Sequence, residues 1–291
     1  MRPSWTGILF LSLISFAMAN AQSSPEWHEK KQSASDLEVS GALAGLPADS
    51  TRYLTRDELL ALPQANFTVT DNTNFTKPAR IRRVRLEELV RRLAGPSAPV
   101  MVVAICDDAY AAYYPRDYLA AHHAVLVLQV NGEPPSRWPK AAEHPDWDMG
   151  PYMISNPKFM PSFKILSHTD EPQIPWGVVR LEFRDEEAVL GAFAPRGPHE
   201  QDREVQDGFR IAQQNCIRCH NEGNEGGQKS GRPWDMLGAM AAASPKDFAA
   251  YVRAPKSKNP QAQMYANPQY DNATLDALTA YFRTFAQPTK P

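Results

Sequence analysis

The chain has 291 residues, enough for two modest domains, because one domain usually takes about 100–200 residues. Its 31 Lys and Arg residues nearly balance 33 Asp and Glu residues, and the formal net charge is −2. This balance excludes the strongly basic surface of a nucleic-acid-binding protein and a polybasic membrane contact. Proline, with 26 residues, outnumbers glycine, with 15, which favours loop-rich connections over long helical bundles.

The first 21 residues are typical of a cleavable secretory signal peptide. Arg2 supplies a positive charge, residues 7–18 form a short apolar run, and residues 19–21 (Ala-Asn-Ala) resemble a cleavage site. The run is too short to span a bilayer comfortably. We therefore expect export to the periplasm with no stable membrane span after cleavage. The alternative is that this segment is retained as an N-terminal anchor.

Residues 22–54 have the composition of a flexible arm. They are rich in Ser, Ala and Glu, with scattered Gly and Pro. Trp27 and His28 lie there without a periodic pattern around them. We therefore expect folded sequence to begin near Thr55.

The predicted elements of residues 55–187 are short and mixed in order. Residues 55–58 form a capping box ahead of a short apolar helix that Pro63 ends. Apolar residues at three- and four-residue steps predict a second helix from about Leu86, stopped by Gly95. The remaining predictions are strands at 67–70, 100–105, 125–130 and 178–183, a helical turn at 115–119, a turn at Asn131-Gly132 and an irregular excursion at 138–163. This mixture favours an α+β domain, followed by a linker over residues 188–199.

Two of the three cysteines lie together in Cys216-Ile217-Arg218-Cys219-His220. C-x-x-C-H is the attachment signature of c-type haem. Residues three apart share one face of a helix, so both thiols can reach the two vinyl groups along one porphyrin edge. His220 then supplies an axial imidazole to the iron. No second cysteine pair completes a zinc site, and the glycine-rich residues 221–231 contain no further Cys or His. We therefore expect one covalent haem in a helical domain over residues 200–287.

This C-terminal segment resembles a class I c-type cytochrome. The features that carry the resemblance are, in chain order, Gly208, the C-x-x-C-H motif, Gly231-Arg232-Pro233, residues 259–264 and residues 278–282. In that family a glycine eight residues before the motif lets the first helix cross the last one closely. A proline carbonyl accepts a hydrogen bond from the proximal imidazole. The resemblance therefore implies an all-α domain in which the Pro233 carbonyl bonds to His220.

The iron needs a sixth ligand or leaves a site for one. Met264 lies 44 residues after His220, and a thioether there stabilises ferrous iron, as in His/Met cytochromes. His199, in the linker, is the competing ligand. Trp234 either shields the haem and bonds a propionate through its N–H, or packs in the core. Arg218 is expected to be solvated or to pair with a propionate.

Residues 55–185 resemble, more weakly, the sulfite-oxidase-like molybdopterin-binding fold. The likeness is carried by residues 84–89, 103–112, 126–134, 150–154 and 176–183. In molybdenum-containing members a cysteine after a strand ligates the metal, and Cys106 lies in a comparable place. A lone cysteine after an apolar strand is more often a small buried hydrophobe, and no Arg/His constellation for a pterin tail is evident. We therefore expect no molybdenum cofactor.

These patterns predict an exported monohaem cytochrome that carries electrons by Fe(III)/Fe(II) cycling, rather than a catalyst. Its N-terminal domain is expected to dock a redox partner protein, either a dehydrogenase or an oxidase. One alternative is an oxidoreductase or oxidoreductase subunit whose N-terminal domain binds a molybdopterin or a substrate and passes electrons to the haem. Another is a haem sensor with an open iron site.

Overall fold

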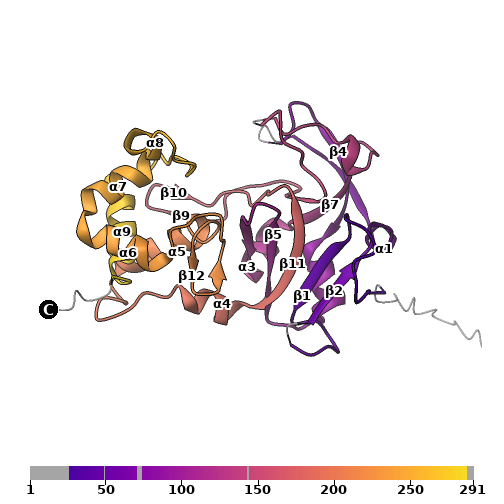
Figure 1. Cartoon of the computed structure of the whole chain (residues 1–291), viewed down its shortest axis with the longest axis horizontal. Coiled ribbons are helices and arrows are strands. Elements are labelled where there is room, and N and C mark those ends of the chain that lie inside the picture. Colours follow the sequence, from indigo (N-terminus) through magenta and orange to yellow (C-terminus); the bar gives the residue numbers. More distant parts are fainter. Residues whose placement is uncertain (1–25, 49, 71–73, 143, 287–291) are drawn as a thin grey trace, which may run out of the picture.

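The computed structural model describes residues 26–286, except residues 49, 71–73 and 143. The predicted signal peptide, residues 1–21, lies outside the described residues. The N-terminal part is β-rich and contains the two larger sheets, whereas the C-terminal part is mostly helical (Figure 1). This division agrees with the predicted α+β and all-α classes. The specific sulfite-oxidase-like fold stays a prediction.

Two sheets build the N-terminal part. The five-stranded sheet has the order β2-β1-β11-β5-β6, with β1 (Leu37–Gly41), β2 (Ser50–Leu54), β5 (Val100–Cys106), β6 (Ala111–Tyr114) and β11 (Val178–Asp185). The four-stranded sheet has the order β3-β4-β7-β8, with β3 (Ala65–Val69), β4 (Ala79–Arg85), β7 (Val125–Val130) and β8 (Met153–Ser155). The helical elements of this part are α1 (Arg56–Ala61), α2 (Leu86–Leu89), a π-helix (Val90–Ala94), α3 (Arg116–His122), a 3-10 turn (Pro135–Arg137) and α4 (Glu186–Ala192). The neighbours β1 and β11 are parallel, and the other neighbouring strands are antiparallel.

The apolar residues of the strands fall into layers. One cluster takes Val102 and Ala104 from β5 together with Leu126 and Leu128 from β7, so the two sheets pack face to face. The alternate residues of β5, such as Val103, belong to a second cluster shared with the C-terminal helices. A third cluster covers the outer face of the four-stranded sheet. Because β5 is buried on both faces, it reads as a continuous apolar run in the sequence.

Local signals predicted several of these elements correctly. The Thr55 side chain accepts from the N–H of Glu58, and the Glu58 carboxylate accepts from the N–H of Thr55, which completes the capping box of α1. Asn131 and Gly132 both have positive φ values, 54° and 84°, and close the tight turn after β7. The predicted strands at 100–105, 125–130 and 178–183 correspond to β5, β7 and β11.

The prediction of a flexible arm over residues 22–54 is wrong for most of that segment. β1 inserts beside β11, pairing Val39 with Leu181, and β2 forms the edge of the sheet. Leu37, Val39 and Leu54 are fully buried. Trp27 packs against the same apolar cluster. Burial of a few apolar side chains in a non-local sheet stabilises a segment whose composition alone suggests disorder.

Five helices and a small hairpin form the C-terminal part: α5 (Arg203–Asn215), α6 (Trp234–Ala243), α7 (Pro245–Arg253), α8 (Pro255–Lys258), α9 (Asn272–Arg283), with β12 (Asn221–Glu222) and β13 (Glu225–Gly226). The first helix crosses the last at Gly208, as predicted. A Cβ atom there would lie 2.1 Å from the Ala277 carbonyl oxygen and 2.7 Å from the Tyr281 Cβ. None of the helices in the described ranges is long and apolar enough to cross a membrane.

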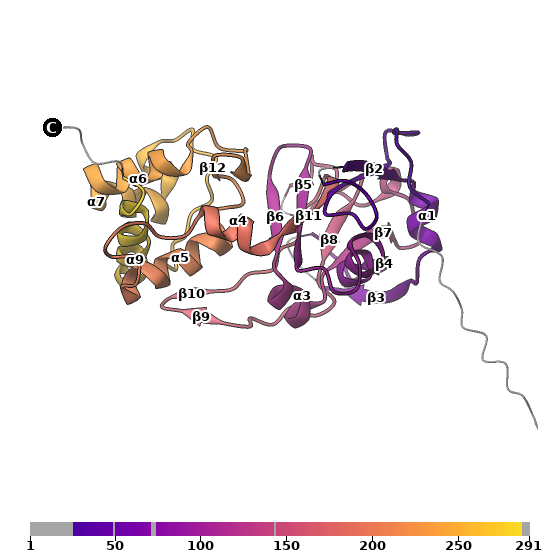
Figure 2. The same ribbon diagram turned by 90° about the horizontal axis from the view of Figure 1, so that it is seen from below.

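The two parts are joined by more than a linker. The predicted linker, residues 188–199, begins inside α4, and its Val189 and Phe193 are buried in the cluster shared with the C-terminal helices. In addition, the hairpin of β9 (Lys164–Ile165) and β10 (His168–Thr169) extends from the N-terminal part alongside α5 and α9 (Figure 2). We call residues 162–171, which contain this hairpin, the strap.

Candidate functional site

The C-x-x-C-H motif forms the turn that follows α5. The N–H of Cys216 donates to the Ala212 carbonyl (2.8 Å), and the N–H groups of Cys219 and His220 donate to the Cys216 carbonyl (3.2 and 3.1 Å). This helical winding brings the two cysteines and the histidine onto neighbouring positions of one turn. Both thiols are free and half-buried. The spacing expected for attachment to one porphyrin edge is therefore present.

His220 has one nitrogen committed to the protein and one left for a metal. The residue is only 9% exposed, and its Nδ1 lies 2.7 Å from the carbonyl oxygen of Arg232. A carbonyl only accepts hydrogen bonds, so Nδ1 carries the proton and Nε2 keeps its lone pair. Burial also lowers the pKa of the imidazole, which favours the neutral form that a metal ligand needs.

The acceptor for His220 was predicted one residue too late. The Pro233 carbonyl instead accepts from the N–H of Leu237 (3.2 Å), because Pro233 is the N-cap residue of α6. The Arg232 carbonyl, just outside the helix, is the one left to face the imidazole. Pro233 therefore lies beside the site and positions it through the start of α6.

Two glycines let the β12–β13 hairpin lie directly against the attachment turn. A Cβ atom on Gly226 would come within 2.3 Å of the His220 carbonyl oxygen, and one on Gly227 within 1.9 Å of the Arg218 carbonyl oxygen. Both contacts are to backbone, which cannot rotate away. The hairpin thus packs tightly behind the motif.

Met264 lies in the loop between α8 and α9. It is half-buried against the same apolar cluster as Cys216. Its neighbour Tyr265, by contrast, is 68% exposed. The competing ligand His199 has a side chain that is 73% exposed and hydrogen-bonded to Asp202 (2.9 Å). Met264 as the sixth ligand stays a prediction, and its burial fits that role better than the position of His199 does.

Trp234 packs in the core rather than bonding a propionate. The residue is fully buried, and its indole N–H donates to the Tyr281 hydroxyl (3.0 Å). That hydroxyl in turn donates to the Phe193 carbonyl (2.6 Å). Because its N–H is already paired with Tyr281, Trp234 joins α6 to α9 and, through Tyr281, to Phe193 at the end of α4.

Arg218 is not solvated, contrary to expectation. Its Nε and Nη2 atoms are buried, because the N-terminal part covers this side of the turn. Burial lowers the pKa of the guanidinium, but Tyr110 and Glu171 raise it more, so the net shift is upward. Burial raises the pKa of Cys216 to about 12, and the charge of Arg218 opposes this shift. Burial also raises the pKa of Cys219.

The strap contacts the start of α9 and, through Tyr270, is linked to Asn215, the residue before the motif. The N–H of Ser167 donates to Thr274 Oγ1 (3.0 Å), and the N–H of Asp271 donates to Ser167 Oγ (2.9 Å). The hydroxyl of Tyr270 is hydrogen-bonded to His168 Nδ1 (3.0 Å) and also accepts from the side-chain amide of Asn215. Burial, aided by the charge of Arg218, lowers the pKa of His168 to about 4. His168 is therefore neutral near pH 7 and pairs with Tyr270 without a charge.

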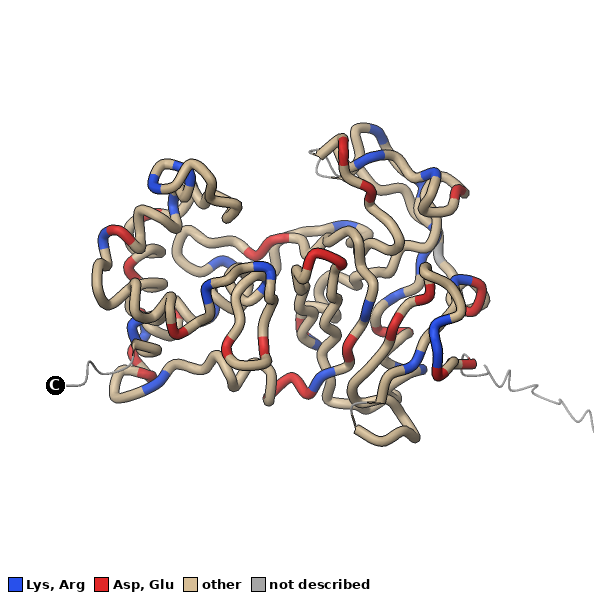
Figure 3. The backbone as a smooth tube through the Cα atoms, viewed as in Figure 1, with Lys and Arg blue, Asp and Glu red and all other residues tan. Residues whose placement is uncertain are grey.

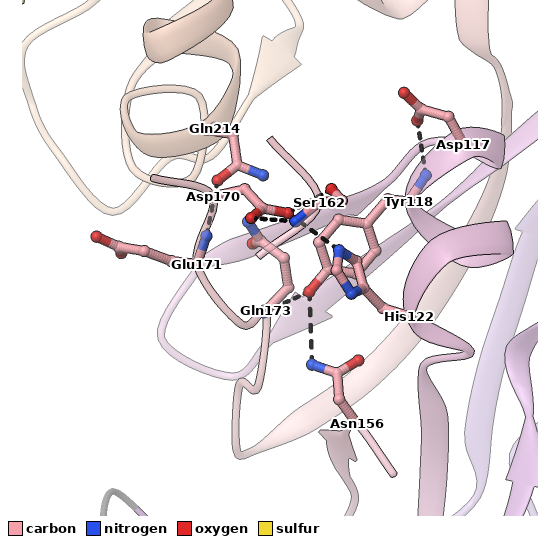
Figure 4. Close-up of polar contacts among 9 residues, drawn as sticks. All are labelled: Asp117, Tyr118, His122, Asn156, Ser162, Asp170, Glu171, Gln173 and Gln214. Carbon is pink, nitrogen blue, oxygen red and sulfur yellow. Dashed lines mark hydrogen bonds and ion pairs between the residues drawn. The ribbon is translucent and has the colours of Figure 1, made fainter. Parts of the chain in front are cut away.

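A polar cluster holds the base of the strap in the N-terminal part. Asp170 accepts from the N–H and hydroxyl of Ser162 (2.8 and 2.7 Å) and from His122 Nε2 (3.0 Å) (Figure 4). The Tyr118 hydroxyl accepts from the N–H of Gln173 (2.8 Å). The imidazole of His122 stacks on Phe159, with ring centroids 4.5 Å apart. These side chains fix the segment that leads into the haem-binding part.

The structure does not place Cys106, the N-terminal candidate ligand, in a metal site. No group of three or more His, Cys, Asp or Glu side chains in the described residues is placed to hold a metal ion. Cys106 is 5% exposed in the core between the sheets, and burial, followed by Asp108 and Asp107, raises the pKa of its thiol. A thiolate is therefore disfavoured there. Elsewhere in this part, His122 pairs with Asp170 (3.0 Å), and its neighbour His123 pairs with Glu87 near the surface (2.7 Å).

The comparison with known families bears on the C-terminal part. Residues 203–282 match the family described as cytochrome C oxidase, cbb3-type, subunit III. The C-terminal part is a cytochrome c domain. Such a domain implies haem c binding, electron transfer and a redox partner. The donor set described above, two free thiols and an imidazole with a free Nε2, fits this group. No curated protein matches the chain significantly.

Sequence reasoning missed the functional residues that depend on the other part of the chain. Arg218, His168 and Tyr270 meet where the strap and the β5–β6 turn reach the cytochrome c domain. The only signal in the sequence was the position of Arg218 between two haem-attaching cysteines. A charged residue there is compatible with solvent or with burial, and its partner segment lies about 100 residues away in the chain.

Proposed function

We propose that the chain is an exported monohaem cytochrome that transfers electrons to or from a partner protein. The observation that supports this best is the pairing of His220 Nδ1 with the Arg232 carbonyl, one turn from two free thiols. It leaves Nε2 as an iron ligand of fixed orientation. Cytochrome c domains are typically extracytoplasmic, which agrees with the predicted signal peptide over residues 1–21.

In this proposal the haem is held by the residues of the attachment turn together with Met264. Cys216 and Cys219 would supply the two thioether sulfurs that attach the haem, and His220 Nε2 would bind its iron. Met264 would supply a thioether as the second protein ligand of the iron. Bound haem provides an iron that takes up and releases one electron by cycling between Fe(III) and Fe(II).

The N-terminal part serves, in this proposal, as the docking platform for the partner. It packs directly on the attachment turn, where the N–H of Ala111 at the start of β6 donates to the Arg218 carbonyl (3.0 Å). A partner seated on this part is therefore held near the haem. Acidic and basic residues are interspersed along both parts of the chain (Figure 3), which favours a partner recognised by shape and local pairing.

A second candidate is an oxidoreductase in which Cys106 ligates molybdenum. Its position favours this reading, because the N–H of Cys106 donates to the Tyr110 carbonyl (2.9 Å), next to the Ala111 bond to the motif. The burial of its thiol disfavours it. The molybdenum-to-iron ratio of purified protein separates the two: a ratio near one supports the second candidate, and a ratio near zero supports the carrier.

The test is to remove the attaching sulfurs. Exported protein carrying Cys216→Ser and Cys219→Ser is expected to lose covalent haem, measured by haem stain after denaturation and by iron content. Cys106→Ser is the matched control and is expected to keep the full haem load. Retention of covalent haem in the double variant, or its absence from the unaltered protein, would contradict the proposal.

A further inference from the structure

Arg218 is held at the boundary between the two parts by its own backbone. Its carbonyl oxygen accepts a hydrogen bond from the N–H of Ala111. Gly227 packs against the same carbonyl, where an added Cβ atom would come within 1.9 Å of the oxygen. The adjacent N–H of Gln228 donates to the Ala109 carbonyl (3.1 Å). The β5–β6 turn therefore covers the residue between the two haem-attaching cysteines.

The guanidinium of Arg218 is buried without a matching counter-ion. Nε and Nη2 have no hydrogen-bond partner among the described residues, and the group that hydrogen-bonds to the guanidinium is the neutral side chain of Tyr110. Its charge lowers the pKa values of Tyr110, Tyr114, Tyr118 and His168, so neutral hydroxyls and an imidazole lie within range of its field. Glu171, half-buried on the strap, supplies the opposing charge at longer range.

A buried cation with so little compensation is costly, and it acts on nearby charges over long distances. In a low-dielectric interior the field of one charge is screened far less than at a surface. Arginine stays protonated at all ordinary pH values, so the field is permanent.

We propose that Arg218 sets the reduction potential of the haem, because its buried positive charge favours the reduced form and the N-terminal part keeps that charge out of water. The inference rests on the proposed function. Reduction of ferric to ferrous iron adds one electron from a redox partner and lowers the positive charge at the iron. A nearby cation opposes the ferric state more than the ferrous state. Glu171, of opposite sign, acts in the opposite direction.

The experiment compares midpoint potentials of haem-loaded, full-length variants by spectroscopic redox titration. Arg218→Gln is expected to lower the midpoint potential, and Arg218→Lys, which keeps the charge, is expected to restore most of it. Glu171→Gln is expected to raise the potential. The matched control is Arg210→Gln on α5, an exposed arginine of the same domain, which is expected to leave the potential unchanged.

Each outcome decides the point. An unchanged potential in Arg218→Gln, or equal shifts in Arg218→Gln and Arg210→Gln, would overturn the inference while leaving the haem assignment intact. If Arg218→Gln does not fold, the midpoint potential of Glu171→Gln still tests the inference. A higher potential supports it, and an unchanged potential would overturn it. Loss of covalent haem from the unaltered protein would instead refute the proposed function.

Discussion

Two buried histidines, His220 in the haem-attachment turn and His122 in the N-terminal polar cluster, are held in different ways. His220 donates from Nδ1 to a backbone carbonyl at 2.7 Å, and Nε2 is left unused by the protein. His122 uses Nε2 on the carboxylate of Asp170, whose side chain is fully buried, and its ring stacks on Phe159. Burial and a polar partner are common to both, so neither property marks a metal ligand. The distinguishing feature is which nitrogen the partner occupies and whether a cofactor-attaching group is nearby.

The strongest test of this comparison replaces each histidine by alanine. His220→Ala is expected to abolish the low-spin haem spectrum and to reduce haem yield at least tenfold, because the proximal ligand is lost. His122→Ala is expected to keep the haem spectrum and to lower the free energy of unfolding by about 3 kcal/mol, since Asp170 loses its buried partner. Absorption spectra and chemical denaturation measure the two effects. A normal haem spectrum in His220→Ala would show that His220 is not the iron ligand that distinguishes it from His122.

The next prediction concerns the helix crossing of the cytochrome c domain. Gly208→Ala is expected to lower the free energy of unfolding by about 3 kcal/mol, because the added methyl group meets the Ala277 backbone at 2.1 Å. The control is Gly191→Ala on α4, where a Cβ meets nothing within 4 Å. That change is expected to be neutral or stabilising by up to about 1 kcal/mol. Equal changes in the free energy of unfolding of the two variants would show that the close helix crossing does not contribute to stability.

A smaller effect is expected on the free energy of unfolding as a function of pH, through His168 in the strap. The pKa of His168 is lowered to about 4, so the unfolded chain takes up a proton before the folded protein does. Stability is therefore lost as the pH falls from about 7 toward 4, by roughly 2 kcal/mol at pH 5. His168→Asn keeps an acceptor for the Tyr270 hydroxyl and is expected to flatten this dependence. The same slope in both proteins, measured by urea denaturation at several pH values, would contradict the assignment.

The smallest effect is expected at the rim of the boundary between the parts. Lys229 and Asp108 form an ion pair there, and both side chains are partly exposed. Asp108→Asn is expected to lower the free energy of unfolding by about 0.5 kcal/mol, with a dependence on salt. The control is Asp148→Asn, which breaks the more exposed pair with Lys140. A loss above about 2 kcal/mol would show that charges, rather than the shared apolar cluster, hold the parts together.

The elements that the sequence predicted well are those whose cause is local. The capping box at Thr55, the positive-φ turn at Asn131-Gly132 and the haem motif all depend on residues within a few positions of each other. The glycine at 208 was also predicted, because the family resemblance supplied its long-range partner. For the first three features the local sequence alone is sufficient, whereas Gly208 needed the family pattern.

The features that were missed depend on segments far apart in the chain. β1 is placed by parallel pairing with β11, which lies about 140 residues later, and its own five residues give no strong signal. The burial of Arg218 depends on the β5–β6 turn in the same way. The error at Pro233 is of another kind: the family pattern located the turn, but the start of α6 decides which of two adjacent carbonyls is free.

The apolar cluster shared by the five-stranded sheet and the helices limits how the molecule can be divided. Met101, Val103 and Tyr113 from the sheet and Ile165 from the strap are covered by the cytochrome c domain. A chain cut at the linker would leave these side chains as a contiguous apolar surface, of the kind that drives aggregation. Residues 203–282 are therefore not expected to be separable from the rest of the chain. They complete the core of the N-terminal part, and the protein is expected to be produced and purified only as one piece.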